Sequence, residues 1–256
     1  MKVVALMQGA DRGPRVLRST YSLYNGATGA LLLIADADHL TNLRTAAASA
    51  VATEALALPD ARVLGIFGTG QVARAHAIAL ASIRPFREIL ICGSSKKKAD
   101  SFAAELLSLD LPPARAVTAD LCAAEADVLC TCTTSSLPLF DGRLLKPGTH
   151  LNLVGAFQPT HREVDTETIL RSRVVVDTLQ GVLSEAGDLL IPISEGATDE
   201  RVVLADLHAV LNNTASVRRN HLDLTLFKSV GCALEDLVAA ELMLRHRSRL
   251  EFEAVL

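Results

Sequence analysis

The chain has 256 residues, half of them hydrophobic, with a formal net charge of −4, 4% aromatic residues and no Trp. This length and apolar content allow one large core or two modest ones. The acidic balance, without a long basic run, argues against a nucleic-acid partner. No apolar segment reaches the roughly 18 residues of a membrane helix, and the start has no signal-peptide pattern. We therefore expect a cytoplasmic protein without membrane association.

The first part of the chain has the pattern of antiparallel strands followed by a helix. The predicted strands are Met1–Leu6, Val16–Tyr24 and Ala30–Ala35. Asp11–Pro14 is predicted to be a loop, and Asn25–Gly29 a turn, because two glycines there can take positive φ. The alanine-rich stretch Asp38–Ala57 predicts a helix with Asp36 or Asp38 as its N-cap.

From Val63 the pattern changes to strands that alternate with helices. The predicted strands are Val63–Phe67, Ile89–Cys92, Arg115–Val117, Val128–Thr131, His150–Val154 and Arg173–Val176. The predicted helices are Gln71–Ile83, Lys97–Leu107, Leu121–Ala126, Thr166–Arg171 and Leu179–Ala186, the last stopped by Gly187. Strands spaced by crossover helices indicate an α/β fold with a doubly wound parallel sheet. A core of Ala, Leu, Val and Ile suits such a sheet.

The last part of the chain has the apolar repeat of one long helix over His221–Arg247, with Leu224–Lys228 as its lead-in. Both ends of the chain thus differ in pattern from the middle. We expect a smaller α+β domain made of residues 1–57 and 222–256, and a dinucleotide-binding domain of residues 58–221.

A strand, a tight glycine turn and a helix start follow one another in VLGIFGTGQVARAHA, residues 63–77. Gly68 can take backbone angles that a Cβ forbids, and Gly70 lets a ligand approach bare backbone. Ala73 is the third small residue of G-x-G-x-x-G/A, which packs helix against strand. The free N–H groups and positive dipole end of the helix would hold a pyrophosphate. The stretch predicts a dinucleotide site, although a structural turn can also use glycines.

The end of the second strand indicates which nucleotide is bound. NAD sites usually have an acidic residue there, which accepts a hydrogen bond from the ribose 2′-hydroxyl. This chain instead has GSSKKK at residues 93–98. Hydroxyls and lysines favour a 2′-phosphate, which a carboxylate would repel. We therefore expect NADP(H) in preference to NAD(H), which remains possible. The alternative is that the lysines are only a solvated helix start.

Arg44, Lys2 and the cysteines are further candidates for a chemical role. Arg44 lies in the apolar helix segment LTNLRTAAASA and needs a partner, either a ligand carboxylate or phosphate or a structural acid. Lys2 alone would be an ordinary strand-end lysine. The five Cys are odd in number, which indicates reduced thiols. Cys130 and Cys132 lack further ligands at metal-site spacing, so no metal is expected.

Five motifs in order resemble the ornithine cyclodeaminase/mu-crystallin family: LTNLRTAAASA, GIFGTGQVARAHAIAL, CTCTTSSLPL, HLNLVGAFQPTHREVD and LTLFKSVGCALEDL. With Lys2 ahead of them they reach Leu237, and the R-T-A-A and F-K-S-V-G-x-A-x-E-D elements are specific to the family. The resemblance implies a Rossmann domain joined to a dimerising, substrate-binding domain, and hence a homodimer. Members include ornithine cyclodeaminases, alanine dehydrogenases, opine-type synthases and reductases of cyclic ketimines.

The resemblance also implies roles for individual residues. Arg44 would bind the substrate carboxylate near the nicotinamide, Lys2 would lie beside the substrate, and Val230 would line the substrate pocket. Ser229 would line the nicotinamide pocket, or it is an ordinary helix N-cap. Together with the glycine turn, the expected cofactor-binding residues are Arg44, Thr45, Gly68, Thr69, Gly70, Gln71, Val72, Gly93, Ser94, Ser95, Lys96, Thr133, Ser135, Val154, Gly155, Ala156, His161 and Ser229.

One departure from the family pattern concerns the reaction. Ornithine cyclodeaminases have an aspartate where this chain has Phe157, and phenylalanine cannot transfer a proton. The segment G-A-F-x-P-T-x-R-E resembles the family's Δ1-pyrroline-2-carboxylate reductases. A protonated imine accepts a hydride directly from a nicotinamide cofactor. We therefore expect reduction of a cyclic imino acid, Δ1-pyrroline-2-carboxylate to L-proline, or its piperideine homologue to L-pipecolate.

A second departure concerns length. Family members usually carry a further segment before the position of Lys2, so we expect the substrate domain to be N-terminally incomplete relative to them. Three other functions stay open: ornithine cyclodeamination with bound NAD, oxidation of an amino acid such as alanine, and cofactor binding without turnover. Phe157 argues against the first, and the shorter start favours the last.

Overall fold

The computed structural model describes residues 1–7 and 16–250, and the side chains of residues 1–5 and 18–246. The predicted loop Asp11–Pro14 lies outside the described residues. The chain divides into two compact units, one of Met1–Arg44 with the part from Ala233 onwards, the other of Thr45–Cys232. Helix α1 (Ala37–Leu56) contributes residues to both. The domain boundaries expected from the sequence, at 57/58 and 221/222, stay a prediction.

The first unit is a small antiparallel sheet covered by a helix. Its strands are β1 (Lys2–Met7), β2 (Val16–Tyr24) and β3 (Leu31–Asp36), and α9 (Ala233–Leu250) packs against β2 and β3. The predicted strands and turn are confirmed, with Gly29 at φ +71°. Asp36 acts as the N-cap of α1, because its Oδ1 accepts from the Asp38 amide at 2.8 Å. Asp38 instead accepts from the amide and hydroxyl of Ser19 on β2.

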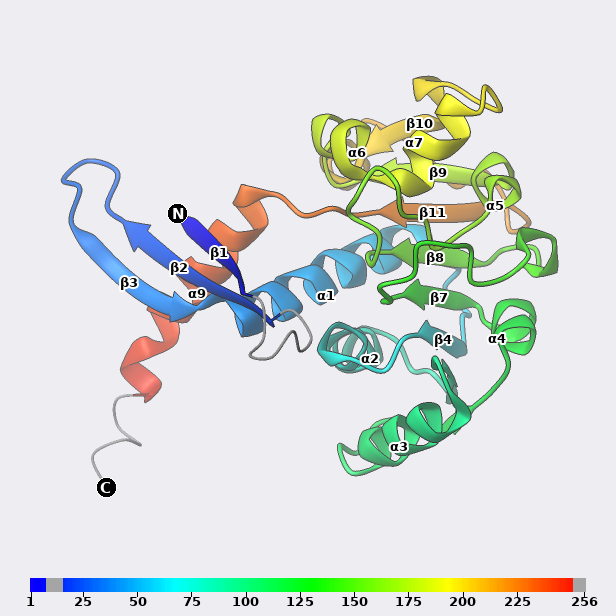
Figure 1. Ribbon diagram of the computed structural model, residues 1–256, viewed down its shortest axis with the longest axis horizontal. Coiled ribbons are helices and arrows are strands. Elements are labelled where there is room, and N and C mark those ends of the chain that lie inside the picture. Colours follow the sequence, from blue (N-terminus) through cyan, green and yellow to red (C-terminus); the bar gives the residue numbers. More distant parts are fainter. Residues whose placement is uncertain (8–15, 251–256) are drawn as a thin grey trace. The chain divides into compact units, whose positions relative to one another are not determined.

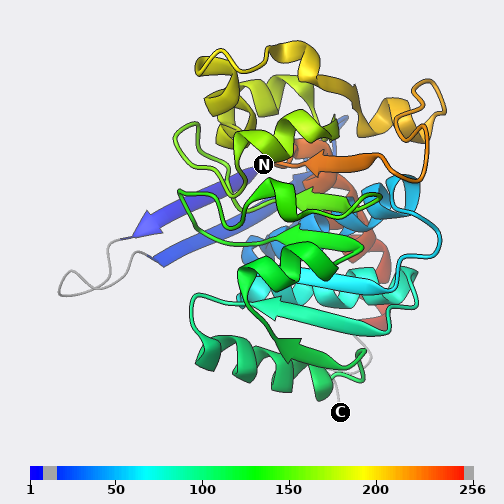
Figure 2. The same cartoon turned by 90° about the vertical axis from the view of Figure 1, so that its right-hand side faces the viewer.

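The second unit contains an eight-stranded sheet within the described residues, in the order β10-β9-β11-β8-β7-β4-β5-β6 (Figure 1, Figure 2). All neighbouring strands are parallel. Since the carboxyl ends of parallel strands lie at one edge, this edge is where ligands of such sheets bind. The strands are β4 (Val63–Phe67), β5 (Glu88–Cys92), β6 (Ala114–Ala116), β7 (Val128–Thr131), β8 (His150–Leu153), β9 (Ser172–Val176), β10 (Val203–Asp206) and β11 (Leu224–Lys228).

Helices cover both faces of this sheet, as a doubly wound fold requires. One apolar core packs α4, α5, α6 and α7 against the strands, and two others pack α1, α2, α3 and α8 on the opposite side. The predicted fold class is confirmed. The helices are α2 (Gln71–Ile83), α3 (Lys96–Leu107), α4 (Ala119–Glu125), α5 (Thr166–Arg171), α6 (Leu179–Glu185), α7 (Gly187–Ser194) and α8 (Leu207–Leu211), with short 3₁₀ turns at Gly142–Leu144 and Glu200–Val202.

One prediction of secondary structure is wrong. Leu224–Lys228 does not lead into a helix, because it is β11, buried at all five residues between β9 and β8. A short, largely apolar run fits a buried strand or a helix equally well. The predicted helix before Gly187 does end there, as α6, and a further helix, α7, begins at Gly187, where a Cβ would collide with the His161 carbonyl oxygen. β10 and α8 had no predicted counterpart.

Candidate functional site

The glycine turn after β4 has the geometry of an anion site. Gly68 takes φ +115°, and a Cβ on it would lie 2.5 Å from the Cys132 carbonyl oxygen, so only glycine fits. Nothing lies within 4 Å of a Cβ position on Gly70, so packing does not demand glycine there. Helix α2 begins at Gln71 without a side-chain cap. Its first N–H groups therefore lack a capping side chain at the positive end of the helix dipole.

The residues around this turn agree with that geometry. Thr69 is half-buried, Gln71 is exposed and Val72 is half-buried at the start of α2. Ala73 is fully buried, which is the close helix-to-strand packing expected of the third small residue. Gly70 and Gln71 are exposed, so an anion such as a pyrophosphate can reach the start of this helix.

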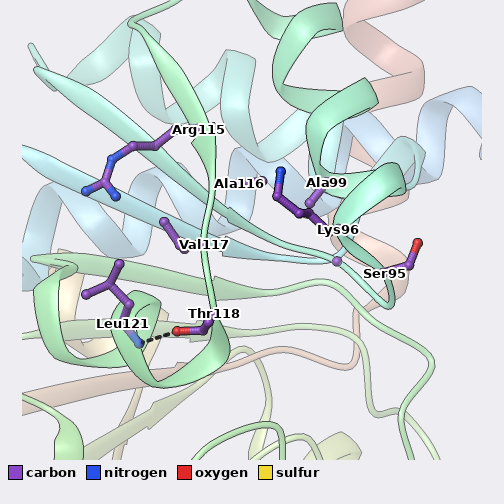
Figure 3. Close-up of a pocket in the computed structure, with 9 residues that line it drawn as sticks. Ser95, Lys96, Ala99, Arg115, Ala116, Val117, Thr118 and Leu121 are labelled. Atoms are coloured by element: carbon purple, nitrogen blue, oxygen red, sulfur yellow. Dashed lines mark hydrogen bonds between the residues drawn. The ribbon is translucent and has the colours of Figure 1, made fainter.

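A pocket of about 470 Å³ lies at the carboxyl end of β5 (Figure 3). Ser95 and Lys96 at the start of α3 line it together with Val117 and Leu121. Its lining, which also includes Gly93, Ala99, Arg115, Ala116 and Thr118, contains no carboxylate. A pocket lined by apolar side chains together with hydroxyl, ammonium and guanidinium groups can hold an adenosine end.

The polar groups at the mouth of this pocket already have local partners. The Ser95 hydroxyl caps α3 by accepting from the Lys98 amide. Lys96 Nζ lies 2.8 Å from Asp100 Oδ2, and Lys98 Nζ donates to Ser94 Oγ at 3.3 Å. Because the Lys96–Asp100 pair is exposed, it contributes little to stability and leaves the ammonium accessible to an anion.

The ends of β7 and β8 are tied together by Glu163, a fully buried carboxylate that the sequence analysis did not single out. Its Oε1 accepts from the amide and hydroxyl of Thr133 at 2.8 and 2.7 Å. Its Oε2 accepts from the Thr131 hydroxyl at 2.7 Å and the Gly155 amide at 2.8 Å. Burial, followed by the nearby Asp188 charge, raises the pKa of Glu163, while Lys228 acts in the opposite direction.

A second buried group holds the next residue of the same loop. Lys228, fully buried at the end of β11, donates from Nζ to the Ala156 carbonyl at 2.6 Å. Its Nζ also lies 2.9 Å from Asp188 Oδ2. Asp188 Oδ1 accepts from the amides of Glu163 and Val164. These residues are far apart in the sequence, and the only signal was a charged residue inside an otherwise apolar segment.

The remaining predicted residues of the second unit lie near these strand ends. Ser229 is not a helix N-cap, because α9 begins at Ala233 and the Ser229 hydroxyl donates to Asp177 Oδ2 at 3.0 Å. The same oxygen accepts from the Val230 amide at 2.7 Å. Three further residues expected at the cofactor are Ser135, Val154 and His161. The Ser135 amide donates to Thr133 Oγ1, and Val154 is buried. His161 Nδ1 lies 3.0 Å from the Thr160 hydroxyl.

The first unit brings Lys2 and Arg44 to a shared acid. Arg44 Nε lies 3.1 Å from Asp236 Oδ1, and its Nη1 lies 3.0 Å from Glu235 Oε2. Lys2 Nζ lies 3.3 Å from Asp236 Oδ2 and donates to Thr41 Oγ1 at 2.7 Å. The side chains are largely buried, with Arg44 12% exposed. The structure thus shows the acid partners that the sequence left open for Arg44.

The predicted residues therefore form two sets. The second unit gathers the expected cofactor residues at the carboxyl ends of β4, β5, β7, β8 and β11, the edge where α/β sheets bind ligands. Thr45, the first residue of that unit, is buried. The first unit holds Lys2 and Arg44. Among the described residues, no cluster of three or more His, Cys, Asp or Glu is arranged for a metal. No described helix has both the length and the apolarity to cross a membrane.

Comparisons with known proteins agree on one family. The sequence model of the ornithine cyclodeaminase/mu-crystallin family matches residues 3–249, which confirms the resemblance. A Δ1-pyrroline-2-carboxylate reductase of Colwellia psychrerythraea is 36% identical over 226 residues, covering 88% of this chain and 72% of the relative.

Two solved structures are similar over nearly the same extent. The Thermococcus litoralis Δ1-pyrroline-2-carboxylate reductase, in complex with NADH and L-proline, has a TM-score of 0.90 and 35% identity, covering 98% of this chain and 78% of that one. An archaeal alanine dehydrogenase dimer with bound NAD has a TM-score of 0.87 and 27% identity, covering 93% and 74%. The likeness thus extends across both units.

Proposed function

The chain belongs to the ornithine cyclodeaminase/mu-crystallin family, and we propose that it reduces a cyclic ketimine carboxylate with NAD(P)H. The preferred substrate is Δ1-pyrroline-2-carboxylate, which gives L-proline. The piperideine homologue, which gives L-pipecolate, is one methylene larger, and such a difference discriminates weakly. Relatives that carry this activity in their names, at 36% and 35% identity, support the proposal.

The observation that carries the proposal is the residue after Gly155 and Ala156 at the end of β8. Phe157 stands there, 53% exposed, and its phenyl group can neither accept nor donate a proton. Deamination of ornithine needs such a group, whereas reduction of a protonated imine needs a hydride donor and a held substrate. A bound nicotinamide supplies the hydride.

The chain's own residues would then hold the two reactants. The Gly68–Val72 backbone binds the pyrophosphate, and the ends of β7, β8 and β11 shape the nicotinamide half. Arg44 and Lys2 bind the substrate carboxylate, since a guanidinium fork and an ammonium suit a carboxylate. Asp236 contacts both cations and keeps them in place.

NADP(H) is the proposed preference. The pocket at the start of α3 presents Ser95 and Lys96 and no carboxylate, which favours a 2′-phosphate over a bare ribose hydroxyl. The solved relatives hold NADH or NAD, so use of NADH at lower efficiency belongs to the same proposal.

A homodimer in the cytoplasm is also proposed. Large apolar side chains of the first unit are about half exposed, which a second copy would cover: Val3, Val4, Leu31, Ile34, Leu234 and Val238. The archaeal relative is a dimer. All five cysteines are free thiols, which suits a reducing compartment. Sedimentation of the purified chain measures the dimer directly, and a monomer at micromolar concentration would contradict it.

The test of the reaction is NADPH oxidation, followed by absorbance, with Δ1-pyrroline-2-carboxylate as the acceptor. We expect turnover that yields L-proline, and none from ornithine. Ammonia released from ornithine with bound NAD would favour cyclodeamination. NADPH binding without turnover of either imine would favour a binding protein, and alanine oxidation with NAD would favour a dehydrogenase.

A further inference from the structure

Resting on the proposed function, we infer that Glu163 is a positioning residue for the nicotinamide half of the cofactor. It contacts no proposed ligand itself. It acts through Thr133 and Gly155, two residues that the family resemblance assigns to the cofactor and that belong to different strand ends. The buried Lys228–Asp188 pair completes the arrangement from the other side of the same loop.

The Glu163 side chain links the residues at the end of β7 to those after β8 by hydrogen bonds. One oxygen takes two bonds from Thr133, and the other takes one from Thr131 and one from Gly155, all between 2.7 and 2.8 Å. The Gly155 backbone passes so close that a Cβ would collide with the Glu163 carboxylate and the Thr133 carbonyl. The backbone ladder ends with the bond from the Val154 amide to the Thr131 carbonyl, and beyond it Glu163 holds Thr133 and Gly155 together.

A carboxylate satisfies all four donors with its two oxygens, and an amide in its place does not. Two of them, the amides of Thr133 and Gly155, are backbone N–H groups that can never accept. They approach different oxygens of Glu163. A glutamine amide has one oxygen, so in either orientation its NH2 faces a backbone N–H that loses its partner. The hydroxyls could rotate, but the amides cannot.

Lys228 and Asp188 hold the residue that follows Gly155, namely Ala156. Lys228 binds the Ala156 carbonyl, while Glu163 binds the Gly155 amide, so consecutive residues are held from two sides by buried charges. Asp188 joins the two groups, because it pairs with Lys228 and accepts from the Glu163 amide. A loop held in this way is preorganised for a ligand rather than ordered on binding.

The experiment compares two ligands on variants of the full chain. NADPH occupies the whole cofactor site, whereas adenosine 2′,5′-bisphosphate occupies only the adenosine end at the α3 pocket. We expect Glu163→Gln to weaken NADPH binding, followed by its fluorescence, by about tenfold or more, as a lost buried hydrogen bond implies. Binding of the bisphosphate, followed by calorimetry, should stay within about twofold, because the α3 pocket and the glycine turn would hold it, and neither hydrogen-bonds Glu163.

Asp165→Asn is the matched control. Asp165 also accepts from two backbone amides and a hydroxyl, but its partners are Gly142 and Thr168 at the start of α5. We expect it to lower the melting temperature without changing the ratio of the two affinities. Thr131→Val is a milder variant that removes one donor to Glu163 and should weaken NADPH binding about threefold if Glu163→Gln does not fold.

The outcomes separate positioning from stability. A loss of NADPH binding with intact bisphosphate binding in Glu163→Gln and Thr131→Val supports the inference. Equal losses for both ligands, or unchanged NADPH binding, overturn it. If the unaltered chain binds NADPH but turns over no imine, the reductase proposal fails while the positioning role is still decided by the affinity ratio.

Discussion

Lys228 Nζ lies 2.9 Å from Asp188 Oδ2, and both side chains have no exposed surface. Two ions removed from water cost several kcal/mol each, and the cost is offset only while they stay paired. The pair therefore keeps the end of β11 and the start of α7 in a fixed relation beside the Gly155–Ala156 loop.

Lys228→Met should lower the free energy of unfolding by about 3–5 kcal/mol, because it leaves Asp188 buried without its cation. The double variant Lys228→Met, Asp188→Asn should recover part of that loss. Urea denaturation measures both, with Lys146→Met as the control, since the Lys146–Asp127 pair is partly exposed and worth about 1 kcal/mol or less. A loss as small as the control's would contradict the role given to the buried pair.

Gly68→Ala and Gly70→Ala should behave differently although only one residue separates them. Gly68 has φ +115° and a crowded Cβ position, so alanine there should cost more than about 1 kcal/mol of stability. Gly70 has open space and φ −97°, so alanine should leave stability within about 0.5 kcal/mol. We expect Gly70→Ala still to weaken NADPH binding, because the Cβ occupies ligand space. Calorimetric melting and fluorescence titration separate the two, and unchanged NADPH affinity in Gly70→Ala would move the pyrophosphate elsewhere.

Ser95→Asp should change the cofactor preference without harming α3. Aspartate is as good an N-cap as serine, so the bond from the Lys98 amide is kept. Its charge repels a 2′-phosphate and can accept from a ribose hydroxyl. The ratio of kcat/KM for NADPH to that for NADH should fall by about tenfold or more, because a carboxylate placed against a phosphate is a like-charge contact. Lys97→Ala, which does not line the pocket, is the control. An unchanged ratio would show that the 2′-phosphate is not recognised here.

Acid should destabilise the chain through two buried histidines. Burial lowers the pKa of His76 to about 4 and that of His150 to about 3. Unfolded histidines titrate near pH 6.5, so the unfolded chain binds more protons below that pH. Their contribution is complete above pH 6.5 and falls by about 1.4 kcal/mol per histidine for each pH unit down to about pH 4.

The measurement is the free energy of unfolding in urea between pH 5 and 7. His76→Gln should be less stable at pH 7, because the bonds of His76 to Val72 and Ser49 are lost. Below pH 6.5 its free energy of unfolding should fall less steeply than that of the unaltered chain, by the share of one histidine, about 1.4 kcal/mol per pH unit. Glu163, whose pKa is raised by burial, acts in the opposite direction in both proteins and cancels in the difference. Equal slopes would contradict the assignment to His76.

The sequence revealed the parts of the fold whose signal is local. Val63–Phe67 and Gln71–Ile83 were predicted with their final bounds, because an apolar run, a glycine turn and a helical repeat follow each other directly. Leu224–Lys228 was misassigned, because a five-residue segment with three apolar side chains shows no clear period and its partners β8 and β9 lie more than 40 residues away. This segment is a strand because it pairs with β8 and β9 in the sheet.

The candidate site divides in the same way. The roles of Gly68 and Ala73 could be predicted because neighbouring residues indicate them. Gly68 takes a positive φ at a tight turn, and Ala73 is buried where the helix packs closely. The roles of Glu163, Asp188 and Lys228 could not be predicted, because a buried charge is recognised only through its partner. Most of these partners are distant in the chain: Asp188 accepts from the Glu163 amide 25 residues away, and Lys228 donates to Ala156 across 72 residues. Phe157 was informative only against a family pattern.

The place of β11 in the sheet also sets an order of assembly during synthesis. β9 and β10 leave the ribosome well before Leu224–Lys228, yet β11 separates them from β8. The growing chain therefore carries two half-sheets with unpaired edges until its last central strand arrives, and such edges invite aggregation. Because β11 joins the two parts and is made last, the sheet should fold as one cooperative unit. A chain cut short before β11 should therefore be bound by chaperones rather than fold into a smaller sheet.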